Sequence, residues 1–230
     1  MIDIVNELNA IHRELGNRPA ADGEAGVSVR LRRSYHTEVE DVWAAVTDPD
    51  RLKRWFLPVS GDLRVGGKFQ LEGNAGGEIL HCEPPRLLKV TFGSETSVVE
   101  LRLSAGGLSA GGVSADGGAG TVLELEHTVP LEMAGSGAGA LYVGPGWDGG
   151  LLGLSLFLQG EVTDDPVAAA NSTEVVEFSA QSVQAWRATV EASGTATADE
   201  IAEVTEVAMA QFGGGALADA LRRTDAAGPS

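Results

Sequence analysis

Five short segments between residues 60 and 130 alternate apolar and polar side chains, and this pattern constrains the fold more than any other feature of the chain. The segments are GKFQLEG, GEILHCE, LLKVTF, SVVELRL and TVLELEH. A period of two places successive side chains on opposite faces of a β-strand. Because glycine and proline separate the segments at short intervals, we expect antiparallel strands connected as a meander. One face of this sheet should be wet and the other covered.

One more strand and two helices are predicted before this region. The segment VSVRLRRSY, residues 27–35, alternates with the same period of two. Val39 and Val42 then begin an apolar stripe at helical spacing, and Asp48 before Pro49 is typical of the start of a second, shorter helix. The predicted order is therefore a strand, two helices and a meander.

The segment GPGWDGGLLGLSLFLQG, residues 144–160, is predicted to be a helix that is apolar nearly all round. Each glycine inside a helix costs about 1 kcal/mol relative to alanine. Gly146, Gly149 or Gly150, and Gly153 lie on one stripe of this helix. Two interpretations stay open: the stripe packs closely against the sheet or another helix, or it faces a cavity and leaves volume for a ligand.

The two ends of the chain are expected to add helices. Ile4, Leu8, Ile11 and Leu15 recur at helical spacing, so a helix is predicted over residues 2–15. Near the other end, apolar stripes and a capping box predict further helices. These helices would cover the outer face of the apolar helix, a role that the partner chain of a homodimer would also fill.

Composition excludes several classes of partner. The net charge of −17 argues against nucleic acid and against anionic membrane surfaces, both of which require a basic face. Cys82 is the single cysteine, so we expect no internal disulfide and no cysteine-rich metal site. The histidines lack the spacing of a metal site, and we therefore expect neither a metal nor a cofactor.

The sequence shows no sign of membrane insertion or export. Its longest apolar run, Leu151–Leu158, is far shorter than the roughly 20 residues that a membrane span needs. The first residues, MIDIVNELNAIHREL, lack the basic start and apolar run of a signal peptide. We expect a cytoplasmic protein.

A set of motifs in order along the chain resembles a known superfamily. The motifs are VEDVWAAVTDPDRLKRWFLP, GDLRVGGKF, GGEILHCEPPRLL, LELEH and GW. Together they are similar to the SRPBCC (START-like, helix-grip) superfamily, and within it to the polyketide cyclase-like branch related to activators of a heat-shock chaperone's ATPase. The resemblance implies an α+β fold in which a curved antiparallel sheet wraps around a long C-terminal helix, with a hydrophobic cavity between them. It does not imply one activity, because members of this superfamily differ widely in function.

The resemblance and the flanking patterns divide the chain into four predicted parts. These are an N-terminal helix and linker (1–26), a START-like domain (27–160), a helical extension packed on that domain (161–223) and a disordered tail (224–230).

The cavity that the resemblance implies would be lined by apolar side chains and a few polar ones. His127 ends its strand on the face of Leu123 and Leu125, so we expect it to point inward as a polar anchor. Asp148, in the first turn of the apolar helix, either complements the helix dipole or faces the cavity. The complete predicted lining is Trp55, Phe69, Leu71, Phe92, Leu101, Leu125, His127, Trp147, Asp148, Leu151 and Leu154.

We expect the protein to bind a hydrophobic small molecule such as a lipid. We assign no catalytic residue. Two alternatives stay open. A cyclase- or hydrolase-like enzyme would need two polar groups converging on one point, such as His127 with Asp148 or Arg33. A protein-interaction module like the co-chaperone relatives would instead bind its partner through an exposed apolar patch.

Overall fold

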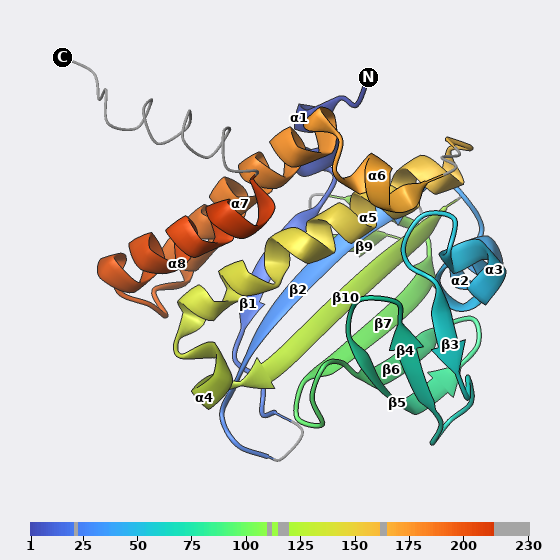
Figure 1. Ribbon diagram of the computed structural model, residues 1–230, viewed down its shortest axis with the longest axis horizontal. Helices are drawn as coiled ribbons and strands as arrows, with labels where there is room; N and C mark the ends of the chain where they lie inside the picture. Colours follow the sequence, from blue (N-terminus) through green and yellow to red (C-terminus); the bar gives the residue numbers. More distant parts are fainter. Residues whose placement is uncertain (21–22, 110–111, 115–119, 162–164, 214–230) are drawn as a thin grey trace.

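The sheet and the helix that it wraps dominate the computed structural model, which describes residues 1–20, 23–109, 112–114, 120–161 and 165–213. Eight antiparallel strands in the order β1-β2-β10-β7-β6-β5-β4-β3 curve beneath helix α5 (Gly144–Leu158), as Figure 1 shows. From β10 back to β3 each strand of the sheet lies beside its predecessor, which confirms the predicted meander. The chain has the α+β helix-grip fold.

The elements follow the predicted order, with additions at both ends. The other strands are β1 (His12–Gly16), β2 (Gly26–Tyr35), β3 (Val59–Gly61), β4 (Lys68–Leu71), β5 (Gly76–Glu83), β6 (Leu87–Thr91), β7 (Val98–Ala105), the separate pair β8 (Gly107–Ser109) and β9 (Gly112–Ser114), and β10 (Thr121–Pro130). The other helices are α1 (Ile4–Asn9), α2 (Val39–Thr47), α3 (Pro49–Leu52), α4 (Leu131–Ala134), a 3-10 turn (Gly137–Tyr142), α6 (Pro166–Ala170), α7 (Thr173–Ser193) and α8 (Ala198–Phe212).

The two faces of the sheet differ as the alternation predicts. Register places Leu125 of β10 opposite Leu31 of β2 on one side and Leu101 of β7 on the other. Leu31 and Leu125 face α5 and are buried. On the opposite face, Arg30 of β2 pairs with Glu126 of β10, with 3.1 Å between Nη2 and Oε1. The curved sheet therefore has one wet, charged face and one covered, apolar face.

The N-terminal segment differs from its prediction. Helix α1 is only six residues long, and residues 12–16 form strand β1, which pairs with β2 at the edge of the sheet. Ile11 and Leu15 are four residues apart, a spacing that suits one face of a helix but also places both residues on the same face of a strand. Pairing with the free edge of β2 satisfies the backbone of this segment, so the helix over residues 2–15 is wrong beyond Asn9.

Helix α7 packs against the outer side of α5. Trp186 of α7 is completely buried, and a Cβ on Gly144 would lie 2.5 Å from the indole of Trp186. Figure 1 shows α7 and α8 side by side next to α5. The division into domain and extension stays a prediction, and the predicted tail, 224–230, lies outside the described residues. In the described part of the chain, no helix has the length and apolar character needed to span a membrane.

Candidate ligand cavity under helix α5

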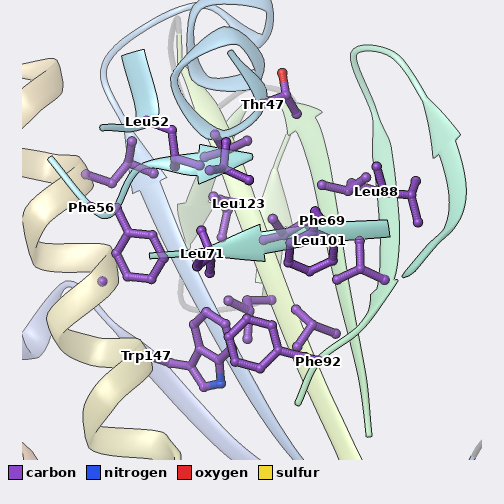
Figure 2. A pocket seen from close by; sticks show the side chains of 18 of the residues that line it. Thr47, Leu52, Phe56, Phe69, Leu71, Leu88, Phe92, Leu101, Leu123 and Trp147 are labelled. Carbon is purple, nitrogen blue, oxygen red and sulfur yellow. The ribbon is translucent and has the colours of Figure 1, made fainter. Parts of the chain in front are cut away.

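A cavity of about 210 Å³ lies between the apolar face of the sheet and α5 (Figure 2). Helices α2 and α3 and the loop after α3 close one end, β4 to β7 and β10 form the floor, and α5 forms the roof. The lining residues are Val46, Thr47, Leu52, Trp55, Phe56, Val59, Leu63, Phe69, Leu71, Ile79, Cys82, Leu88, Val90, Phe92, Val99, Leu101, Leu123, Leu125, Trp147, Gly150, Leu151 and Leu154.

The floor of the cavity follows from strand register. Leu88 of β6 lies opposite Leu101 of β7, and Leu101 lies opposite Leu125 of β10. These three leucines form one row across three strands on the face toward α5, and all three line the cavity. The period-two pattern therefore positions this floor directly.

Nine of the eleven predicted lining residues lie along the cavity, and His127 and Asp148 do not. Several residues that line the cavity were not among those predicted, for two different reasons. Leu88, Val90, Val99 and Leu123 carried a signal, because they alternate on the same faces as the predicted residues. Cys82 did not: simple alternation puts it opposite Ile79, but a β-bulge between Ile79 and His81 brings both Ile79 and Cys82 to the cavity wall.

His127 lies behind the cavity wall and holds it in place. Its Nδ1 accepts a hydrogen bond from Trp147 Nε1 at 3.0 Å, and its Nε2 is 2.8 Å from the hydroxyl of Ser97. Because the indole N–H is only a donor, Nδ1 carries no proton and Nε2–H donates to Ser97. Burial lowers the pKa of His127 to about 4, in keeping with a neutral imidazole. His127 therefore fixes the orientation of Trp147, which lines the cavity and packs on Phe92 with ring centroids 5.3 Å apart.

Asp148 points to the other flank of α5. Successive residues of a helix differ by about 100° in direction, so Asp148 turns away when Trp147 faces the cavity. Its Oδ2 accepts a hydrogen bond from Arg13 Nε of β1 at 2.8 Å and another from the Ser182 hydroxyl of α7. Burial raises the pKa of Asp148 to about 6, while Arg13 and Ser182 act in the opposite direction. The expectation that Asp148 lines the cavity is wrong, because a partner distant in sequence holds its carboxylate elsewhere.

Arg33 is also engaged away from the cavity. It lies buried on β2, donates to Ser155 of α5 at 2.6 Å, and pairs with Glu7 of α1. The structure therefore does not bring His127 together with Asp148 or Arg33, the pairings on which the enzyme alternative rested.

The cavity wall offers almost no polar chemistry. Among its lining residues only Thr47 and Cys82 carry a side-chain hydroxyl or thiol, and none carries a carboxylate, an imidazole or a cationic group. Burial raises the pKa of the Cys82 thiol, which keeps it protonated. Within the described ranges, no cluster of three His, Cys, Asp or Glu residues is arranged to hold a metal ion. The geometry therefore favours binding of an uncharged, apolar group.

Comparisons with known proteins agree with this fold. The family model described as activator of Hsp90 ATPase homolog 1-like protein matches residues 36–148. The chain is similar to CalU16 from Micromonospora echinospora, with 39% identity over 79% of this chain and 98% of the CalU16 crystal structure and a TM-score of 0.62. For the solution structure of CalU16 the identity is 39%, the coverage is 80% and 96%, and the TM-score is 0.63.

A more distant structure shares the fold alone. The conserved protein of unknown function EF2215 from Enterococcus faecalis is 15% identical, with a TM-score of 0.50 over 81% of this chain and 95% of that protein. No curated protein matches the chain.

Proposed function

Because the chain belongs to the activator of Hsp90 ATPase homolog 1-like family within the SRPBCC superfamily, whose fold suggests a ligand-binding domain, we propose that it binds an uncharged hydrophobic small molecule between the sheet and α5. The observation that carries the proposal is the cavity of about 210 Å³, whose wall is apolar except for Thr47 and Cys82.

Physical chemistry supports a neutral ligand. A charge transferred into an apolar wall without a partner loses its hydration, which costs many kcal/mol. Burial of apolar ligand surface instead contributes about 25 cal/mol per Å², so an aromatic group burying about 200 Å² gains about 5 kcal/mol before ordering costs.

The wall is also held in shape before any ligand arrives. Trp147 is fixed by His127, and Trp55 Nε1 donates to the carbonyl oxygen of Ala45 at 3.0 Å. Two large aromatic walls thus have defined orientations in the free protein. Preorganisation of this kind raises affinity, because less side-chain entropy is lost on binding.

Binding of N-phenyl-1-naphthylamine, a neutral fluorescent probe, tests the proposal. We expect saturable binding to the wild type and at least a tenfold loss of affinity in Leu101→Trp, which fills the cavity from its floor. The matched control is Arg102→Trp, which adds the same side chain on the exposed face of the same strand and should leave affinity unchanged.

Native mass spectrometry of freshly purified protein is the complementary measurement, since a co-purified neutral molecule should be present in the wild type and lost from Leu101→Trp. Equal probe binding by the wild type and Leu101→Trp would contradict the proposal, and so would the absence of binding by a folded wild type.

A further inference from the structure

The glycine stripe of α5 packs closely at two places and faces open space between them. A Cβ on Gly153 would lie 3.2 Å from the carbonyl oxygen of Trp55, and a Cβ on Gly146 would lie 3.4 Å from the ring of Phe212. At Gly149 and Gly150 a Cβ would have no neighbour within 4 Å. The stripe therefore packs closely at Gly146 and Gly153 and borders open space at Gly149 and Gly150. The space beside Gly149 lies on the side of α5 that faces away from the sheet.

That space is a second cavity, of about 530 Å³, which we call the outer cavity. It lies between α5, α6, the first half of α7 and the loop after α3, on the side of α5 away from the sheet. Gly146, Gly149, Gly150 and Gly153 all line it, together with apolar side chains such as Val175. Its volume lies within the range of about 300–1,000 Å³ that is usual for small-molecule sites, whereas the cavity between the sheet and α5 is smaller than that range.

The two cavities share part of their walls. Trp55, Phe56 and Gly150 line both. Trp55 and Phe56 belong to the loop after α3, and their ring centroids are 5.4 Å apart. Figure 2 shows the Phe56 ring on the α5 side of the cavity between the sheet and α5. Phe56 is only half-buried, and Gly150 contributes no side chain to the boundary. A side chain at position 150 would project into the boundary between the two cavities.

We propose that the two cavities form one elongated site joined beside Gly150, with Phe56 as the movable wall between them. The proposal rests on the function proposed above. The apolar end of the ligand occupies the cavity between the sheet and α5, and its polar end lies in the outer cavity. The outer cavity contains groups of both charges, Arg54, Glu161 and Glu174, alongside the hydroxyl-bearing Ser172. This mixed set suits an uncharged hydroxyl-bearing end, so the ligand class is a neutral long-chain amphiphile.

Displacement of N-phenyl-1-naphthylamine by 1-hexanol and by 1-dodecanol tests the junction. Each methylene buried in apolar surroundings raises affinity about fourfold, so a continuous site should bind dodecanol at least 100-fold more tightly than hexanol. Gly150→Leu blocks the junction and should lower the ratio of dodecanol to hexanol affinity at least tenfold. Gly150→Ala is the matched control, because it removes the same helix glycine but adds only one carbon, and it should change that ratio by no more than about threefold.

The outcomes separate this inference from the proposed function. Suppose that hexanol and the fluorescent probe bind the wild type but Gly150→Leu leaves the ratio of dodecanol to hexanol affinity unchanged. The continuous site is then wrong, and the cavity between the sheet and α5 remains a binding site. If neither hexanol nor the probe binds the folded wild type, the proposed function itself is wrong. Far-ultraviolet circular dichroism of each variant confirms that α5 still forms.

Discussion

The two flanks of helix α5 are built in opposite ways. Toward β1, β2 and the middle of α7, the helix presents Asp148 to Arg13 and Ser155 to the buried Arg33. Toward the centre of the sheet and toward α6, it presents leucines and glycines, and cavities remain. The difference indicates a division of roles, in which the charged flank fixes the position of the helix and the apolar flank leaves open volume.

The charged flank connects segments that are far apart in sequence. Arg13 of β1 and Ser182 of α7 each donate a hydrogen bond to the carboxylate of Asp148 in α5. A buried ion pair is weak evidence for stability, because desolvation offsets much of the attraction, but it orients the groups that it joins. Strand β1, α5 and α7 are therefore held in one arrangement by a contact that an apolar interface would not specify.

The largest expected effect comes from removing the cation on the charged flank. Arg13→Met leaves the Asp148 carboxylate buried without its positive partner, so we expect a loss of about 3–5 kcal/mol in the free energy of unfolding at pH 7.5. The measurement is urea denaturation followed by circular dichroism. The loss should be smaller at pH 4.5, where Asp148 is protonated and needs no cation.

A matched control is available in an exposed ion pair. Glu191→Ala removes the partner of Arg187 on the surface of α7 and should cost less than about 1 kcal/mol. A loss of similar size in Arg13→Met would show that the charged flank does not fix the helix, and the contrast between the flanks would disappear.

The pH dependence of stability gives the next largest effect. Burial raises the pKa of Asp148 from 3.8 to about 6 in the folded protein, so between these values the folded state binds more protons than the unfolded state. The contribution of Asp148 to stability is therefore greatest at low pH and falls as pH rises. Between pH 4.5 and 7.5 it should fall by about 2 kcal/mol.

Comparison with Asp148→Asn isolates this contribution from the other titrating groups. The unfolding free energy of the wild type relative to Asp148→Asn should decrease by that amount over the interval, as measured by urea denaturation at several pH values. A difference that stays constant, or that increases with pH, would mean that Arg13 fully compensates for the burial of the carboxylate.

The sequence predicts the apolar flank better than the charged one, for a physical reason. Alternation is a local property, and it placed Phe69, Leu101 and Leu125 on the face that lines the cavity. The direction of Asp148 depends on Arg13, 135 residues away, and no local pattern specifies that contact. The β-bulge that turns Cys82 inward is likewise a matter of strand pairing rather than of composition.

The smallest expected effect comes from the glycines, whose stripe the sequence identified without indicating which positions face open space. Gly149→Ala adds a methyl group to open space and removes a helix glycine, so it should stabilise the protein by about 0.5–1 kcal/mol. Gly153→Ala makes the same chemical change, but its methyl group meets the carbonyl oxygen of Trp55 at 3.2 Å, and the gain should be lost. Thermal unfolding of both variants measures the difference. Equal melting temperatures of the two variants would show that the space beside Gly149 closes in solution. The apolar flank would then be as fully packed as the charged flank.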